Sequence, residues 1–502
     1  MKKSNYVLFA TILVLACLCL VLVACGENSS VPNNGYPYAN NGSYNNSTNQ
    51  SNNYGTSNNG TSNTSSEVRG ITLSQTTLAL DEGTSGTINA SISPSTATNK
   101  TINWSSSDTS VATVQNGIVT AQNVGTCIIT AQSANGITAN CTVTVNRGEF
   151  VFSEYSYGYA MVAYLGNQSN VTVPSTYKGK PVLAIGSLTN ESGSAGAYDG
   201  FYGNGTLVSV NLPEGLKDIN RASFAGCSSL KSVVVPNSCV RIRYCAFSRC
   251  SALEEIVIPP FCTYGEWVLG MCINIKRLTL PVLDNNSVAN DLPTYLFYSP
   301  SELKQGIDLT INGGTRVGNW EGIKNKLNKL KIETSVIDDR AFAGYKNVSS
   351  VVIGGSVTSI GDAAFYDCSG LTSVSIPNSV TSIRQWAFAY CSGLTSVAIP
   401  SSVTSIGGGV FAECRRLTSI TIPEGVPYIG SKAFSGCSAL ESITIPDSVT
   451  FTEEYAFRGC SGLKSINYQG TWVQWSAIVK GKCWNDSTGN YVIHCTDGDF
   501  AK

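Results

Sequence analysis

Short runs of alternating apolar and polar residues recur through the second half of the chain. In one such run Leu371, Val374 and Ile376 are apolar, whereas serine and threonine occupy the positions between them. An apolar side and a polar side predict a short strand that packs on a core. Pro377 follows, where the end of a strand can accommodate proline, and a second apolar stretch begins at Val380.

The run repeats every 23 residues, and phenylalanine marks the period most clearly. The phenylalanines that keep this step are Phe224 and Phe247, and then Phe342, Phe365, Phe388, Phe411, Phe434 and Phe457. A period of this length predicts a solenoid, in which each coil buries its apolar edge on the next. Each coil then adds a strand to a parallel sheet, with a rise of about 4.8 Å. We therefore expect a mainly β fold with a solenoid over residues 148–502.

The repeat becomes irregular between residues 282 and 341. Phe297 can fill one aromatic position, and residues 309–311 suggest a strand. Residues 319–330 carry apolar side chains at helical spacing, namely Trp320, Ile323, Leu327 and Leu330. This stretch is either a helix that replaces an outer segment of one coil or an insertion shaped for a partner.

Residues 68–147 indicate a separate small domain. About seven short alternating strands follow one another, and Asn135-Gly136 predicts a hairpin turn, so we expect a two-sheet sandwich. Cys127 and Cys141 fall on neighbouring strands with their side chains inward. They are candidates for a disulfide, or they pack as small apolar residues.

The first 25 residues have the composition of a secretory signal. Lys2 and Lys3 precede an apolar stretch over residues 7–24, which an uncleaved membrane helix would also explain. The ending Leu22-Val23-Ala24-Cys25 resembles a bacterial lipobox, and this resemblance implies lipid attachment at Cys25. Residues 26–67 are almost wholly Asn, Ser, Gly, Thr and Tyr, which predicts a disordered tether with a span of roughly 35 Å.

Charge and catalytic chemistry narrow the possible functions. Charged residues make up 13% of the chain and the formal net charge is −1. The chain therefore lacks the excess of positive charge that nucleic-acid-binding proteins use to attract phosphates. The sequence contains one histidine, His494, near its end, and no phosphate-binding glycine loop. We therefore expect no enzyme and no cofactor, and a hydrolase that uses His494 is the weakest hypothesis.

Most cysteines follow the repeat. One position of the coil holds Cys227, Cys250, Cys368, Cys391, Cys414, Cys437 and Cys460, and another holds Cys239 and Cys262. They can be small core residues, scattered disulfides or metal ligands. Cysteines that stack one coil apart are spread along the axis of the solenoid. A zinc ion needs four ligands that converge on one point, so we expect no metal site. Cys483 and Cys495 are further candidates for a disulfide.

The outward positions of the strands are rich in hydroxyl groups. The candidate ligand-binding residues on this face are Ser350, Ser373, Ser375, Ser396, Ser419, Thr421, Ser442, Thr444 and Ser465. The face is either a solvated surface or a low-charge docking strip for a protein or a glycan. Trp386 and Tyr455 fill a position that is otherwise small or charged, and they are candidate aromatic anchors.

Two stretches of the sequence resemble known protein families. The run from Trp104-Ser-Ser-Ser-Asp108 to Gly125-Thr-Cys-Ile-Ile-Thr-Ala131 resembles the bacterial immunoglobulin-like group 2 domain. The recurring Ser-Val-Thr-Ser-Ile-Gly, Ala-Phe and Cys-Ser-Gly-Leu resemble BspA-type leucine-rich repeats. These resemblances imply an immunoglobulin-like β-sandwich followed by a leucine-rich repeat solenoid with parallel sheets, in a surface protein that binds other proteins.

We therefore expect a monomeric, non-catalytic adhesion protein, lipid-anchored on the extracellular face of a bacterial membrane. Its partner would be an extracellular protein on a host or a neighbouring cell. The alternative is an envelope scaffold that binds the wall glycan or the secreted proteins of its own cell.

Overall fold

The computed structural model describes residues 66–187, 199–282, 292–304 and 306–501. The expected signal sequence, the lipidation position Cys25 and nearly all of the tether lie outside the described residues. Within these ranges no helix has the length and apolar character that crossing a bilayer requires.

The first domain is built from short strands in three small sheets. Strand orders are β2-β9-β8-β5, β3-β7-β6 and β1-β4. The β8–β9 hairpin turns at Asn135-Gly136, as expected, with Gly136 at φ 88°. The strands are β1 (Gly70–Leu73), β2 (Thr77–Asp81), β3 (Ser85–Thr87), β4 (Ala90–Ser93), β5 (Ile102–Ser106), β6 (Ala112–Gln115), β7 (Ile118–Ala121), β8 (Gly125–Ser133) and β9 (Thr138–Asn146).

Alternation in these strands buries one face of each sheet. Ile129 and Val143 are completely buried, and Trp104 packs at the edge of the same core. The sequence-based prediction of a sandwich is therefore confirmed.

One flank of the solenoid carries its longer strands. A nine-stranded sheet has the order β12-β15-β17-β19-β21-β22-β23-β25-β27, and a second sheet continues as β29-β31-β33-β35-β36. The bounds are β12 (Asn170–Thr172), β15 (Ser209–Asn211), β17 (Ser232–Val234), β19 (Glu255–Val257), β21 (Arg277–Leu280), β22 (Ile307–Ile311), β23 (Leu327–Ile332), β25 (Ser350–Ile353), β27 (Ser373–Ser375), β29 (Ser419–Thr421), β31 (Ser442–Ile445), β33 (Ser465–Tyr468), β35 (Val492–Cys495) and β36 (Gly498–Ala501).

A second flank carries shorter strands. Its sheets have the orders β10-β11-β14-β16-β18-β20, with β13 paired to β14, then β24-β26-β28 and β30-β32-β34. The bounds are β10 (Phe150–Tyr155), β11 (Gly158–Tyr164), β13 (Thr176–Tyr177), β14 (Lys180–Ile185), β16 (Asp218–Ile219), β18 (Arg241–Ile242), β20 (Thr263–Tyr264), β24 (Val336–Ile337), β26 (Ser359–Ile360), β28 (Ser382–Ile383), β30 (Tyr428–Ile429), β32 (Phe451–Thr452) and β34 (Val479–Lys480).

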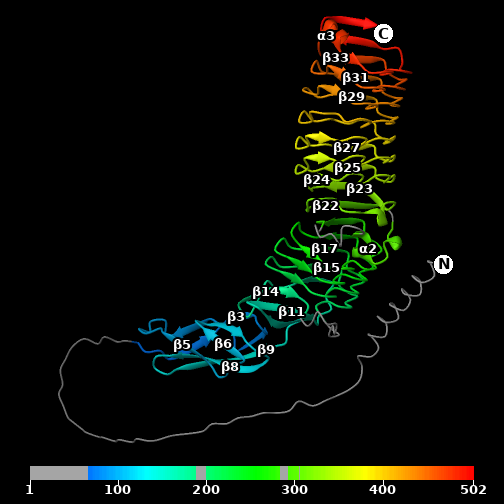
Figure 1. The fold of residues 1–502 in the computed structure, drawn as a ribbon. Coiled ribbons are helices and arrows are strands. Elements are labelled where there is room, and N and C mark those ends of the chain that lie inside the picture. The colour runs from blue at the N-terminus through cyan, green and yellow to red at the C-terminus, as the bar shows by residue number, and fades with distance from the viewer. Residues whose placement is uncertain (1–65, 188–198, 283–291, 305, 502) are drawn as a thin grey trace, which may run out of the picture. The chain divides into compact units, whose positions relative to one another are not determined.

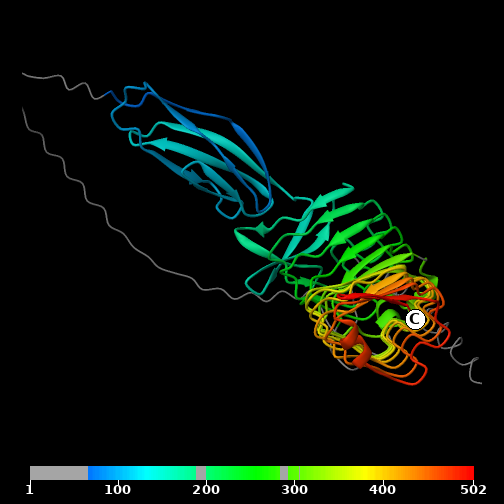
Figure 2. The same ribbon diagram turned by 90° about the horizontal axis from the view of Figure 1, so that it is seen from above.

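Strands of successive coils pair in parallel, in the register that the 23-residue period predicts. Ser350 faces Ser373, and Ser419 faces Ser442, which in turn faces Ser465. Figure 1 shows the coils following one another in chain order from β15 to β33, and Figure 2 shows the green strands of the first flank side by side. The prediction of a solenoid with parallel sheets is confirmed.

A column of phenylalanine rings fills the interior of the C-terminal coils. The rings from Phe342 to Phe457 are completely buried. Neighbouring centroids lie 5.3–5.8 Å apart with planes within 11° of parallel. Trp484 then closes the column edge-on, with its ring 5.9 Å from that of Phe457. Each ring from Phe365 to Phe457 is thus covered by rings of the coils on either side.

The main cysteine position ties each coil to the coil before it. Each thiol donates a hydrogen bond to the backbone carbonyl of the aromatic position one coil earlier, at 3.0–3.3 Å. Cys391, for example, donates to the Phe365 carbonyl at 3.2 Å. These thiols are buried, which agrees with their interpretation as small core residues. The thiols of this position are Cys227, Cys250, Cys272, Cys368, Cys391, Cys414, Cys437 and Cys460.

The prediction of a helix over residues 319–330 is wrong. Only a single 3₁₀ turn forms there, η2 (Glu321–Ile323), and Leu327 and Leu330 lie in strand β23. Pairing of β23 with β22 skips Asn328, and this irregularity widens the spacing of buried residues from two to three. The bulge therefore imitates a helical period.

Other helical segments of the described residues are short. Phe297 occupies an aromatic position, as expected, and is buried. It lies at the end of α2 (Leu292–Phe297), and η1 (Pro300–Glu302) follows. Near the C-terminus, α3 (Trp472–Ala477) begins with a capping box formed by Thr471 and Gln474.

Replacing a ring of the column should be far more costly than replacing an exposed one. We expect Phe388→Ala to lower the free energy of unfolding by about 3–5 kcal/mol, because it leaves a cavity between two rings. Phe261 is 92% exposed, so Phe261→Ala should change it by about 0.5 kcal/mol or less. Urea unfolding followed by circular dichroism measures both values. Equal effects would contradict the stacking account.

The buried thiols should make the solenoid sensitive to alkaline pH. Burial raises the pKa of Cys414 and of Cys460 from the ordinary value of 9.0 to about 12. At pH 7 both thiols are neutral in the folded and in the unfolded protein. Above about pH 9 the unfolded chain releases their protons, whereas the folded protein retains them. Stability should therefore fall as the pH rises from about 9 toward 12.

Urea midpoints measured across this pH range test the expectation. The matched variant carries Cys414→Val and Cys460→Val, and its midpoint should fall less steeply with pH than that of the parent. Lysine and tyrosine ionisation is common to both proteins and cancels in the comparison. Identical slopes would show that these thiols are not responsible.

Candidate binding surface

The hydroxyl-rich positions predicted from the sequence do form rows on the first flank. Ser350 and Ser373 stand on β25 and β27, and Ser419, Ser442 and Ser465 stand on β29, β31 and β33. These side chains are exposed or partly exposed. The row is continuous because the repeat places one serine in every coil.

Ser396 belongs to the same row by position but not by secondary structure. Residues 394–400 form no strand, although Thr395 still donates its backbone N–H to the Thr372 carbonyl at 3.4 Å. The sheet of the first flank is therefore interrupted here, between β27 and β29. Ser396 itself is exposed.

The second row lies two residues further along each strand. Thr421 faces Thr444 across β29 and β31, and Ser375 occupies the matching position on β27. Among the described residues of the two rows, Ser465 donates its hydroxyl to the Asn467 amide oxygen at 3.0 Å. The predicted rows thus present hydroxyl groups to solvent.

Threonines at the strand starts have a different role. Thr372 donates its hydroxyl to the Ser349 carbonyl at 2.9 Å, and Thr395 and Thr418 donate to the preceding coil in the same way at 3.4 Å. These hydroxyls link the coils. The outward rows are therefore the ones that remain open to a ligand.

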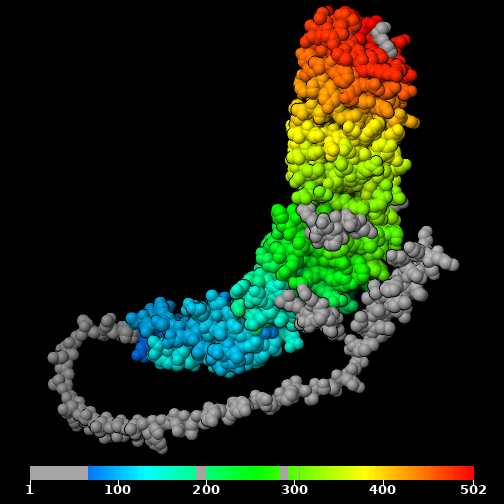
Figure 3. All heavy atoms as spheres, in the orientation of Figure 1, coloured from blue at the N-terminus to red at the C-terminus, as the bar shows by residue number. Residues whose placement is uncertain are grey.

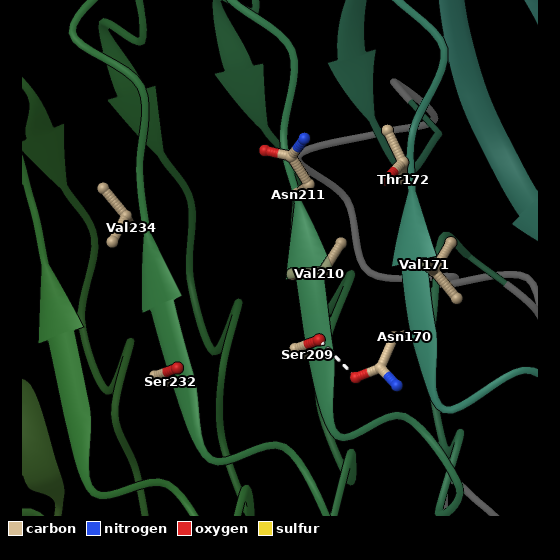
Figure 4. Close-up of a pocket in the computed structure, with 8 residues that line it drawn as sticks. All are labelled: Asn170, Val171, Thr172, Ser209, Val210, Asn211, Ser232 and Val234. Atoms are coloured by element: carbon tan, nitrogen blue, oxygen red, sulfur yellow. Dashed lines mark hydrogen bonds between the residues drawn. The ribbon is translucent and has the colours of Figure 1, made fainter.

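The same rows continue into the N-terminal coils, where the sequence analysis did not follow them. A shallow hollow there is lined by Asn170, Val171, Thr172, Ser209, Val210, Asn211, Ser232 and Val234 (Figure 4). Ser209 donates its hydroxyl to the Asn170 amide oxygen at 2.7 Å. The first coils are atypical in sequence, so only the observed pairing of β12, β15 and β17 aligns these side chains.

Charged residues separate the two hydroxyl-rich zones. Arg277 on β21 lies 2.6 Å from Glu255 on β19, and Lys329 on β23 lies 4.0 Å from Asp308 on β22. The hydrogen bond from Arg277 lowers the pKa of the Glu255 carboxyl. Opposite charges alternate from coil to coil, so this part of the face is close to neutral.

Trp386 and Tyr455 occupy a corner of the coil and are only partly exposed. Both have left-handed backbone conformations, with φ 58° and 59°. The Trp386 ring lies over Gly409 of the next coil, where any side chain would collide with it. Tyr455 lies between two cations, Lys432 at 6.0 Å and Arg458 at 5.4 Å from its ring centroid. Each ring is therefore held along the corner rather than projecting freely from it.

A larger aromatic group occupies the same corner in earlier coils, and the sequence analysis missed it. The Trp267 ring lies 5.5 Å from Tyr244 and 4.8 Å from Tyr298, and Arg221 stacks 5.1 Å above Tyr244. Exposed Arg249 and Met271 occupy the next corner turn of these coils. We call this group the aromatic corner; its residues are Arg221, Tyr244, Arg249, Trp267, Met271 and Tyr298.

Three residues of the aromatic corner have a left-handed backbone conformation. Trp267, Met271 and Tyr298 have φ 53°, 60° and 65°. Bulky residues rarely adopt this region, at a cost of about 1–3 kcal/mol each. Other coils place glycine at such corners, as at Gly409 and Gly436, or another large residue, as at Arg340 and Lys432. Aligning the coils at Cys245 and Trp267 would have revealed this pattern.

The single histidine contacts an aspartate on the neighbouring strand. His494 lies on β35, about half-exposed, and its Nδ1 is 2.7 Å from the Asp499 carboxylate on β36. Over the ranges that the structure describes, no three His, Cys, Asp or Glu side chains gather where a metal ion could bind.

The cysteines considered for disulfides are free thiols in the structure. Cys127 faces Val143 and Cys141 faces Ile129, so the two sulfurs are on diagonal rather than directly opposed positions of β8 and β9. Cys483 and Cys495 are partly exposed and unbonded to each other.

Comparison with known proteins agrees with this architecture. The family model "BspA type Leucine rich repeat region" matches residues 197–309 and 335–464 in six copies, and "Bacterial Ig-like domain (group 2)" matches residues 67–145. Proteins built from such leucine-rich repeats are typically non-catalytic binding scaffolds. A minor capsid protein of Enterobacteria phage T3 is 47% identical over 77 residues, which is 15% of this chain and 18% of that protein. The chain spans about a third or less of the length of the curated relatives it matches.

Two solved structures of bacterial leucine-rich proteins are also similar. A leucine rich cell surface protein from Faecalibacterium prausnitzii is 25% identical, covers 66% of this chain and 97% of its own, and has a TM-score of 0.26. A leucine-rich repeat protein from Bacteroides ovatus is 22% identical, with coverages of 69% and 99% and a TM-score of 0.30. From the repeats and the two family matches together, the chain is a BspA-type leucine-rich repeat protein with an N-terminal group 2 bacterial Ig-like domain.

Proposed function

We propose that this protein is a non-catalytic binding protein of the cell surface, which attaches to a protein on a host or a neighbouring cell. The observation that carries this proposal is the aromatic corner. Tryptophan, tyrosine, arginine and methionine are the residue types enriched at the energetic centres of protein interfaces. Six such side chains lie on successive coils, and ring contacts join Arg221, Tyr244, Trp267 and Tyr298.

Their surroundings favour binding over a purely structural role. Met271 is 46% exposed, although methionine is usually buried. Arg221 and Arg249 are exposed, and the Arg221 guanidinium stacks on Tyr244. The strained backbone at Trp267 and Tyr298 keeps large rings where glycine would be more stable.

Attachment at the surface is the second part of the proposal. The lipobox-like sequence would anchor the protein at Cys25 on the outer side of a bacterial membrane, and residues 26–67 would hold the folded domains away from it. Family members with this repeat are surface proteins, which supports this placement. We propose that the protein acts as a monomer and without a cofactor.

A second candidate function is supported by the hydroxyl-rich face. The hollow in Figure 4 presents amide and hydroxyl groups with few charges, and such groups suit the hydroxyls of a sugar. On this view the protein would be a scaffold that binds the wall glycan of its own cell through Asn170, Asn211 and the outward serines.

Removing the rings of the aromatic corner should weaken attachment without unfolding the protein. We expect Trp267→Gly with Tyr298→Gly to reduce binding by about 30-fold or more, because each ring is placed like a hot-spot residue. Glycine readily adopts the left-handed backbone conformation of both positions, so the melting temperature should not fall. Immobilised extracellular matrix proteins and purified wall glycan are the probes, and biolayer interferometry gives the affinities.

The matched control is Trp386→Gly, which relieves the same strain at the same corner position of a distant coil. It should change binding less than twofold. If the double variant binds the matrix proteins as well as its parent does, the proposed interface is refuted. Binding to wall glycan alone, lost on Asn211→Asp, would favour the scaffold instead.

A further inference from the structure

Two buried cysteines of neighbouring coils bring their sulfur atoms into contact. The Sγ atoms of Cys239 and Cys262 lie 3.9 Å apart, and the residues are only 2% and 1% exposed. Each cysteine follows an equivalent turn, and donates its backbone N–H to Pro236 at 3.0 Å or to Pro259 at 3.1 Å. The two side chains therefore occupy the same position of consecutive coils.

Packing does not require cysteine at this position. In the C-terminal coils the position is filled by buried valine, namely Val357, Val380, Val403, Val426 and Val449. Cysteine replaces it in two coils of the described repeats, and those two coils are adjacent. Two cysteines therefore occupy positions at which valine would pack in the core equally well.

The hydrogen bonds of these two thiols differ from those of the main cysteine position, which runs from Cys227 to Cys460. We call the thiols of that position the ladder thiols. Ladder thiols donate to phenylalanine carbonyls at close distances, as Cys250 does to Phe224 at 3.1 Å. The carbonyls nearest to Cys239 and Cys262 are 3.5 Å away. Oxidising a ladder thiol would leave a buried carbonyl without its donor, whereas oxidising this pair breaks only weak contacts.

We infer that Cys239 and Cys262 form an inter-coil disulfide under oxidising conditions. The two thiols together lose two protons and two electrons, and one S–S bond forms. The oxidant is a disulfide, in the cell that of a thiol–disulfide oxidoreductase, which is reduced to two thiols as it takes up the electrons and protons. No further reactant is needed.

The geometry allows this bond with a small movement. Strands of adjacent coils are about 4.8 Å apart, which lies within the Cα separation of about 4.4–6.8 Å that disulfides span. The sulfurs would approach from 3.9 Å by side-chain rotation. Because both are buried, the reaction would occur during folding or on local opening of the coils.

The bond would fasten the two coils that carry Tyr244 and Trp267. Tyr244 follows Cys239 by five residues, and Trp267 follows Cys262 by five residues. A covalent link between the coils limits how far they separate and restricts the unfolded chain. The inference itself rests on the sulfur positions and does not depend on the proposed binding function.

Peptide mapping of the full folded chain tests the inference. The protein is refolded in a mixture of oxidised and reduced glutathione, its remaining thiols are blocked, and it is digested without reduction. We expect one cross-linked pair of peptides that contain Cys239 and Cys262. Its mass should be two hydrogens below the sum of the separate peptides. The oxidised protein should melt about 5 °C higher than the reduced protein.

Two valine variants make the test specific. Cys239→Val copies the other coils, so it should fold, lose the cross-link and lose the difference in melting temperature between oxidised and reduced protein. Cys437→Val removes a ladder thiol and should keep both. Finding only glutathione adducts or cross-links between other cysteines would overturn the inference, as would a redox-dependent melting temperature that persists in Cys239→Val.

Discussion

The contact between one coil and the next is the interaction on which the whole solenoid depends. No coil is long enough to enclose its own apolar residues, so the ring of Phe388 is buried only because Phe365 and Phe411 cover its two faces. The thiol of Cys391 reinforces this contact by donating to the Phe365 carbonyl. Because both interactions need a neighbour in exact register, the period of 23 residues is maintained through the C-terminal coils.

The outward positions of each coil are not needed for contact between the coils. Core residues, strand-start threonines and ladder thiols hold the stack together. The serine rows and the corners take no part in these contacts. Figure 3 shows the outer surface of the coils, in chain order from green to red. The left-handed backbone at the corners is held by glycine in some coils and by larger residues such as Arg340, Glu413 and Lys432 in others. The rings of Trp267 and Tyr298 differ from these because they contact each other, and Trp267 also contacts Tyr244.

The same side chain has different chemistry in two positions of one coil. At the ladder position a cysteine meets a backbone carbonyl and serves as a hydrogen-bond donor. At the position of Cys239 the nearest backbone carbonyls are 3.5 Å from the thiol, and the sulfur of Cys262 lies 3.9 Å away. Both positions place cysteines on adjacent coils, so the distance from each thiol to a backbone carbonyl is what distinguishes them.

The sequence by itself determined the elements, the period and the inward face of each strand, because these follow from local alternation of apolar and polar residues. It therefore predicted the sandwich, the parallel solenoid and the serine rows. It failed where the register changes: the bulge at Asn328 imitated a helix, and the atypical coils hid the hollow at Asn170. Only the tertiary structure decided which residues of different coils meet, as at Trp267 and at Cys239, since those contacts depend on how unequal coils align.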